Sequence, residues 1–120
     1  MVKLNEINVP ANSSVSATTV REWLAEDSIL LIDVREPEEH ADEHIPGSVL
    51  LPLSSLNPAD LPEAKGRRRV LLCLTGKRSA IALGRLAAEG VTDLLHLEGG
   101  LLAYKVAGGQ TVEAGEAVAA

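Results

Sequence analysis

The sequence predicts an α/β domain whose central sheet is mainly parallel. Three short runs, 29–34, 70–74 and 94–97, are almost entirely aliphatic and do not alternate with polar residues. Such runs are typical of strands that are covered on both faces, as in a parallel sheet. Stretches with the apolar spacing of helices lie between them. Because the chain has only 120 residues, we expect one compact domain with its own core.

The composition argues against several classes of function. The net charge is −6, which does not favour contacts with nucleic-acid phosphates, and only 2% of the residues are aromatic, which argues against base stacking. The apolar runs are too short to span a membrane, and the first residues lack the apolar stretch of a signal peptide. A single cysteine cannot form an internal disulfide. We therefore expect a cytoplasmic protein that binds neither nucleic acid nor a membrane.

The first part of the chain is expected to lead into a helix. Residues 1–15 are polar and form a lead-in segment, either an edge strand or a loose stretch. The helix should begin between Ser16 and Thr19 and end near Asp27. Thr19 and Glu22 have the spacing of a capping box.

Turn signals divide the middle of the chain. The stretch 35–44 is highly charged and reads as loop-like, and the turn Ile45–Gly47 closes it. Residues 49–51 form a short strand, which Pro52 ends. The connection 58–66 contains two prolines and a glycine, so it has room for at most a short helix.

Two more helices are expected in the second half. Residues 79–89 place apolar side chains on one face, and Gly90 is positioned to end this helix. A last helical stretch covers 101–106. We assign residues 16–108 to the folded domain and residues 109–120 to a weakly ordered tail.

The only cysteine of the chain lies where a buried strand ends. Cys73 opens a short loop that runs into the next helix, and the loop consists of Leu74, Thr75, Gly76, Lys77, Arg78 and Ser79. The helix start offers unpaired N–H groups and a positive dipole end, and Gly76 allows the loop to curl around an anion. Lys77 and Arg78 add positive charge. This arrangement would stabilise an anionic sulfur, as a thiolate or as a persulfide.

Two simpler readings compete with this one. A lone cysteine at a strand end is commonly a small buried apolar residue, but cysteine, glycine, two cations and a helix start fall here within seven residues. The loop of cysteine phosphatases resembles the pattern Cys-x5-Arg-(Ser/Thr), with five residues between cysteine and arginine. Here only four residues separate Cys73 from Arg78. The smaller ring suits a single sulfur atom better than a phosphate.

The loop resembles the rhodanese active loop, Cys-x-x-Gly-x-Arg. Three further segments resemble motifs of the same family in the same order: Leu31–Arg35 with Glu39, His44–Ser48, and Glu98–Gly100 with Ala103 and Tyr104. Together they cover roughly residues 16 to 108. His40, Glu43 and Tyr104 depart from the family pattern, which has Phe or Tyr, Gly and Trp at these positions.

The resemblance implies a rhodanese-like three-layer sandwich and a sulfurtransferase. Sulfane sulfur would move from thiosulfate or a persulfide donor, through a Cys73 persulfide, to cyanide or to a thiol acceptor, which can be a protein. No metal or organic cofactor is implied. Lys77 and Arg78 would orient the anionic donor, while Thr75 and Gly76 contribute chiefly backbone N–H groups.

Some other polar residues are expected to have supporting roles. Asp33 ends a strand at the same sheet edge and should accept hydrogen bonds from backbone or arginine, and Arg35 should pair with Glu98 or another carboxylate. The histidines His40, His44 and His96 are potential metal ligands, but we expect no metal site.

Two alternatives remain open at the level of function. The domain could be a non-catalytic rhodanese-like module that binds a partner or senses redox state. It could also be a related cysteine phosphatase or arsenate reductase, which the loop length disfavours. The physiological donor and acceptor, the pathway and the oligomeric state are not encoded in any motif of the chain.

Overall fold

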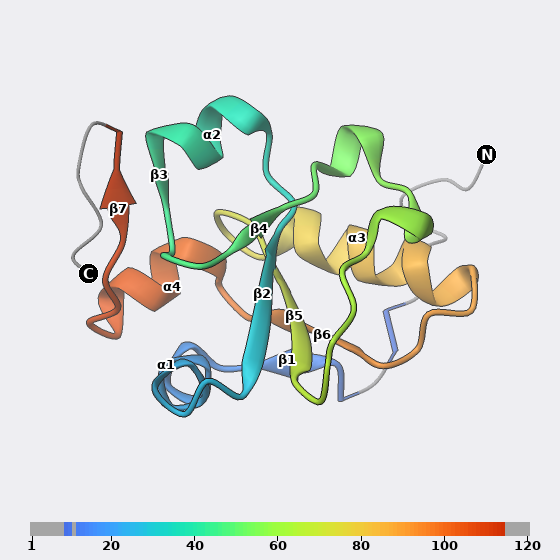
Figure 1. Ribbon diagram of the computed structural model, residues 1–120, viewed down its shortest axis with the longest axis horizontal. Helices are drawn as coiled ribbons and strands as arrows, with labels where there is room; N and C mark the ends of the chain where they lie inside the picture. Colours follow the sequence, from blue (N-terminus) through green and yellow to red (C-terminus); the bar gives the residue numbers. More distant parts are fainter. Residues whose placement is uncertain (1–8, 11, 115–120) are drawn as a thin grey trace.

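A parallel sheet forms the centre of the molecule. The computed structural model describes residues 9–10 and 12–114. The five-stranded sheet has the order β1-β6-β5-β2-β4, and every pair of neighbouring strands in it is parallel (Figure 1). Its strands are β1 (Ser14–Val15), β2 (Ile29–Asp33), β4 (Val49–Leu50), β5 (Arg68–Leu72) and β6 (Leu94–Leu97). The expected α/β class with a mainly parallel sheet is confirmed.

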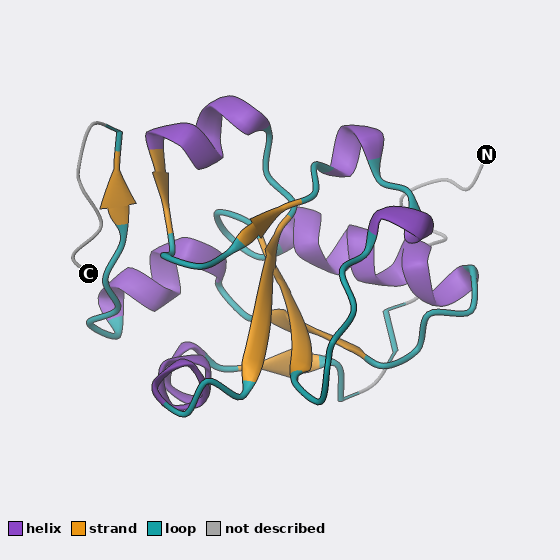
Figure 2. Ribbon diagram, in the orientation of Figure 1, coloured by secondary structure: helices purple, strands orange, loops and turns teal. Residues whose placement is uncertain are grey.

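Helices cover both faces of this sheet and make a three-layer structure (Figure 2). They are α1 (Ala17–Ala25), α2 (Pro37–Asp42), α3 (Lys77–Ala88) and α4 (Gly100–Val106), with short 3-10 helices η2 (Leu53–Ser55) and η3 (Pro58–Asp60). Side chains of α1 and α4 pack on one face of the sheet, and those of α3 pack on the other. Within the described residues, no helix has the length and apolar character needed to cross a membrane.

The alternation of side chains along β5 decides which face holds the cysteine. Val70 and Leu72 belong to the apolar cluster of α1 and α4, whereas Leu71 and Cys73 belong to the cluster of α3. This follows from the strand geometry, in which successive side chains point to opposite faces. Cys73 therefore lies just beyond the carboxyl end of β5, on the side of α3.

Ser16 caps α1, and the expected capping box at Thr19 is wrong. The backbone of Ser16 is extended, with φ −73° and ψ 157°, and its side-chain oxygen accepts a hydrogen bond from the Thr19 N–H at 3.2 Å. Thr19 already lies inside the first turn, so its N–H is one of those that a cap must satisfy.

The charged stretch 35–44 contains a helix, contrary to the expected loop. Most of it forms α2, and the next two residues form β3 (Glu43–His44). Pro37 occupies the first turn, where its missing N–H removes no helical hydrogen bond. The Glu39 side chain accepts the Glu36 N–H at 3.1 Å, which fixes the helix start.

A short strand lies within the expected tail. β7 (Val112–Glu113) pairs antiparallel with β3 in a second, two-stranded sheet, and the Val112 side chain is buried. At these positions the structure differs from the weakly ordered tail that we expected. Residues 1–8 and 11 of the lead-in segment, and residues 115–120 of the tail, lie outside the described residues.

A bidentate ion pair ties α2 to the start of α3. The Arg78 guanidinium donates to the two carboxylate oxygens of Glu39 at 2.6 and 2.9 Å. The hydrogen bonds from Arg78 lower the pKa of Glu39 from 4.5 to about 2, although partial burial acts in the opposite direction. α2 has no buried residue of its own, so polar contacts of this kind hold it in place.

The start of α4 lies directly against the backbone that follows β5. The Leu101 and Leu102 N–H groups donate to the carbonyl oxygens of Cys73 and Leu74, at 2.8 and 3.1 Å. Gly100 has φ +64°, and a Cβ atom there would lie 2.5 Å from the Cys73 oxygen. Only glycine allows this approach, which holds the loop and α4 together.

We expect Gly100→Ala to lower the free energy of unfolding by about 2 kcal/mol, because the new Cβ would combine backbone strain with a clash against immobile backbone atoms. Urea unfolding measures this loss. Gly90→Ala is the matched control, since Gly90 also has a positive φ of 94° but has nothing within 4 Å of its Cβ position. Equal losses in the two variants would contradict the proposed close packing.

We expect Glu39→Gln to lower the free energy of unfolding by about 1 kcal/mol at neutral pH, an estimate reduced for solvent screening of a side chain that is 34% exposed. Because the pKa of Glu39 is lower in the folded chain, this stabilisation is present above pH 4.5 and is lost as the pH falls towards 2. The difference between wild type and variant, followed by urea unfolding at decreasing pH, should shrink accordingly. Glu38→Gln removes the same charge from an exposed neighbour and should show little effect. A Glu39→Gln effect that does not depend on pH would contradict the ion-pair account.

Candidate functional site

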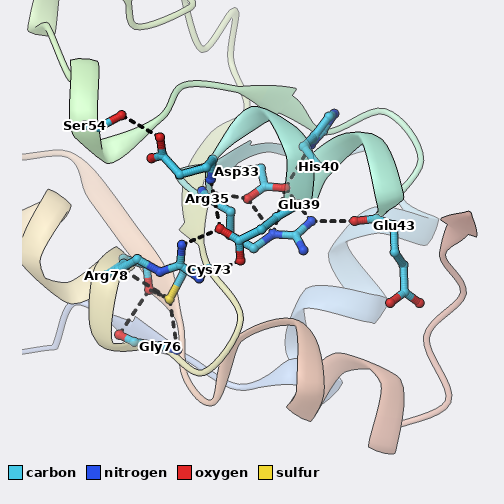
Figure 3. Close-up of polar contacts among 11 residues, drawn as sticks. Asp33, Arg35, Glu39, His40, Glu43, Ser54, Cys73, Gly76 and Arg78 are labelled. Atoms are coloured by element: carbon cyan, nitrogen blue, oxygen red, sulfur yellow. Dashed lines mark hydrogen bonds and ion pairs between the residues drawn. The ribbon is translucent and has the colours of Figure 1, made fainter. Parts of the chain in front are cut away.

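The Cys73 sulfur lies inside a turn of backbone at the start of α3. It accepts hydrogen bonds from the N–H groups of Gly76 and Ser79, at 3.1 and 3.3 Å (Figure 3). Gly76 is the N-cap residue of α3 and has φ +100°, so the chain can reverse there without the strain that a side chain would introduce. Cys73 as a whole is only 1% exposed. The geometry favours negative charge on the sulfur, because two amides and the positive end of a helix face it.

The loop residues do not all face the sulfur. Thr75 and Lys77 are exposed, and the Leu74 side chain packs against the apolar cluster of α1 and α4. In the described part of the chain no hydrogen bond joins Thr75 to the sulfur, so the backbone donors are those of Gly76 and Ser79. The structure therefore brings Cys73, Gly76 and Ser79 together and leaves Thr75 and Lys77 towards solvent.

Arg78 is engaged by a carboxylate. Its guanidinium forms the bidentate pair with Glu39, and Figure 3 shows it between Glu39 and the cysteine. The hydrogen bond and charge of Glu39 raise the pKa of Arg78, and the charge of Cys73 acts in the same sense. Arg78 is thus a positive charge near the sulfur that is already neutralised in part. Lys77 has no ion pair among the described residues and is the cation of the loop that an anion can approach from solvent.

Asp33 and Arg35 form a buried polar unit beside this site. Asp33 is fully buried and accepts hydrogen bonds from the Arg35 backbone N–H and guanidinium and from His40 Nδ1, at 2.8 to 3.2 Å. Burial alone would raise the pKa of Asp33, but the hydrogen bonds from Arg35 and His40 outweigh it and lower that pKa. Arg35 pairs with Asp33, so Glu98 as its partner is wrong and the alternative of another carboxylate holds. Arg35 also donates to the Glu43 carbonyl at 2.6 Å.

This unit fixes the chain around the site. It joins the end of β2 to β3 and to α2, and α2 carries the Glu39 carboxylate that binds Arg78. Both carboxylate oxygens of Asp33 accept hydrogen bonds from neighbouring chain segments. This is expected of a structural carboxylate and not of a base.

The sequence did not indicate that His96 reaches the cysteine loop. The fully buried Ser79 hydroxyl lies 3.7 Å from the Cys73 sulfur and 3.1 Å from Nδ1 of His96, which is 8% exposed. Burial lowers the pKa of His96, while the charge of Glu98 acts in the opposite direction. In the sequence, the available signal for this contact was a polar residue, His96, within the otherwise aliphatic run 94–97. The fold shows that its ring faces Ser79.

The other two histidines, His40 and His44, contact each other and, among the residues that the structure describes, do not form a metal-binding group with further ligands. The rings of His40 and His44 stack with centroids 4.2 Å apart, and Nδ1 of His44 lies 2.8 Å from the His40 carbonyl oxygen. Across the described residues there is no group of three or more His, Cys, Asp or Glu side chains that could hold a metal ion.

Comparisons with known proteins identify the family that the chain resembles. The model of the rhodanese-like domain family matches residues 16–107. An uncharacterized protein of Synechocystis is 46% identical over 102 residues, which cover 85% of this chain and only 57% of that protein. A sulfurtransferase of Allochromatium vinosum is 33% identical over 103 residues, which cover 84% of this chain and 88% of that protein.

A solved structure shows the same fold. The crystal structure of a rhodanese-related protein from Thermoplasma volcanium matches with a TM-score of 0.72 at 28% identity, over 82% of this chain and 96% of that one. The parallel sheet between two helical layers is therefore the fold of a known family. The chain belongs to the rhodanese-like domain family.

Proposed function

We propose that this chain is a sulfurtransferase that carries sulfane sulfur as a persulfide on Cys73. The observation that supports the proposal most directly is the pair of amides, of Gly76 and Ser79, that donate to the Cys73 sulfur at the start of α3. These donors lower the free energy of a thiolate relative to a thiol. Relatives with sulfurtransferase in their names, such as that of Allochromatium vinosum, lend further support.

The first half of the reaction loads the cysteine. The Cys73 thiolate attacks the outer sulfur of thiosulfate, a new S–S bond forms, and the original S–S bond breaks. Sulfite leaves with the electron pair of the broken bond, so charge and electrons balance without an oxidant. The product is Cys73–S–S⁻, whose negative end remains near the positive end of α3.

The second half returns the enzyme to its starting state. Cyanide, or the thiolate of a small molecule or protein, attacks the outer sulfur of the persulfide. The S–S bond breaks, Cys73 leaves as a thiolate, and the acceptor departs as thiocyanate or as a persulfide. Because one product leaves before the acceptor reacts, the steady-state kinetics should be of the ping-pong type.

The two cations of the loop, Arg78 and Lys77, have different roles in binding the donor. Arg78 is held by Glu39, so its charge acts on the sulfur from a fixed position. Lys77 is exposed at the first position of α3 and is the side chain available to attract an anionic donor. Thiosulfate, or a persulfide with an anionic carrier, is the donor chemistry that this arrangement suits.

We expect incubation with thiosulfate to add the mass of one sulfur atom to the intact chain, and Cys73→Ser to abolish both this addition and thiocyanate formation. Intact-mass spectrometry and a thiosulfate–cyanide assay measure these outcomes. The hydrolysis of an aryl phosphate serves as the counter-assay. Phosphatase activity without sulfur uptake would favour the cysteine phosphatase, and absence of both activities would favour a binding or redox module.

We expect Lys77→Ala to raise the KM for thiosulfate about threefold at low ionic strength, because an exposed charge contributes modestly to binding and is screened by salt. The effect should shrink at high salt, and kcat should change little. Arg85→Ala is the matched control, since it removes the same charge from an exposed position two turns further along α3. An equal rise in KM for both variants would show a general effect of net charge instead.

A further inference from the structure

The Cys73 sulfur has a third potential donor whose direction is set by a buried histidine. Cys73, Ser79 and His96 form a continuous row through the α3 side of the core, with the Ser79 hydroxyl in the middle. The row continues to Ser14 of β1, whose exposed hydroxyl lies 3.5 Å from Nε2 of His96. We propose that His96 is a positioning residue that directs the Ser79 hydroxyl towards the Cys73 thiolate.

The single proton of the Ser79 hydroxyl can be donated to only one neighbour at a time. The Ser79 hydroxyl has one proton and three neighbouring acceptors: the Cys73 sulfur at 3.7 Å, the Gly76 carbonyl oxygen at 3.2 Å and His96 Nδ1 at 3.1 Å. If Nδ1 carried no proton, it would compete for the hydroxyl proton. If Nδ1 is protonated, it donates to the Ser79 oxygen, and the hydroxyl proton is left for the sulfur or the carbonyl.

The charge on the sulfur decides between the two remaining acceptors. A hydrogen bond to an ionised group is roughly twice as strong as one between neutral groups, so a thiolate attracts the hydroxyl proton more strongly than the Gly76 carbonyl does. The thiolate then has three donors: the Gly76 N–H, the Ser79 N–H and the Ser79 O–H. In the thiol form the direction reverses, and the Cys73 S–H donates to the Ser79 oxygen.

The surroundings of His96 favour the neutral ring. It lies on β6 between β1 and β5, opposite Ser14 and Leu71 in the strand register, and α3 supplies Ser79. Burial lowers the pKa of His96, and Glu98, the charged group that opposes this effect, lies on the same chain segment. With Nδ1 protonated, Nε2 is an acceptor, and the Ser14 hydroxyl is the donor within its reach.

Two amide substitutions separate the proposed role from a merely structural one. In His96→Asn the side-chain NH2 lies close to the position of Nδ1, whereas in His96→Gln it lies close to the position of Nε2. Both variants bury a neutral amide of similar polarity. The asparagine variant can therefore still donate to Ser79, and the glutamine variant cannot do so from the same place.

The test measures the thiolate fraction of Cys73 by the rate of alkylation with iodoacetamide. Each rate at pH 7 is divided by the rate of the same variant at pH 10, so that differences in access to the buried sulfur cancel. We expect this ratio to fall about tenfold in Ser79→Ala and in His96→Gln, and to stay near the wild-type value in His96→Asn. The double variant Ser79→Ala with His96→Gln should be no worse than Ser79→Ala alone, because His96 acts through Ser79.

Equal ratios for the asparagine and glutamine variants would overturn the proposal, and so would additive effects in the double variant. Urea unfolding of each variant confirms that the ratios refer to folded chains. The inference rests on the thiolate of the proposed function, but alkylation needs no sulfur donor. A chain that never takes up sulfur would refute the sulfurtransferase proposal and still answer the question about His96.

Discussion

The structure depends on a single constraint: a sulfur atom has to lie where a buried strand ends and a helix begins. β5 is covered on both faces, so the chain leaves it only at the carboxyl edge of the sheet. The turn at Gly76 then brings two amides of α3 back to the sulfur. α4 binds the carbonyl groups of the same turn from the other side, and the loop is thereby held by two helices and a strand.

The charges near this site are largely balanced within the chain. Asp33 neutralises Arg35, and Glu39 neutralises Arg78. A count of arginine and lysine in the loop therefore overstates the positive field that an approaching anion meets. Backbone amides and the helix dipole supply fixed partial charges that no carboxylate cancels, and they act over short distances. The site is thus better suited to a small anion in contact with the loop than to a large polyanion at a distance.

The parts of the structure that followed from the sequence are those with a long apolar pattern. β2, β5, β6 and α3 each bury a recognisable run or face, and the loop between β5 and α3 could be located from these elements. α2 has six residues and no buried side chain, so it offers no periodicity to detect. Val112–Glu113 is likewise too short to show a pattern.

The partners of the site residues were less predictable than the elements. Glu39 meets Arg78 across 39 positions of the chain, and His96 meets Ser79 through the packing of α3 on the sheet. Such pairs depend on strand register and on the placement of a helix, which local sequence does not determine. The same limit explains why Asp33, and not Glu98, was found beside Arg35.

The burial of the only cysteine has a consequence for contacts between two copies of the chain. A thiol that is 1% exposed is poorly accessible to the cysteine of a second folded chain, which limits covalent dimerisation. An added sulfur carries the terminal atom of the side chain about 2 Å farther from the backbone. That sulfur, and not the cysteine Sγ, would then be the atom that lies farthest from the backbone.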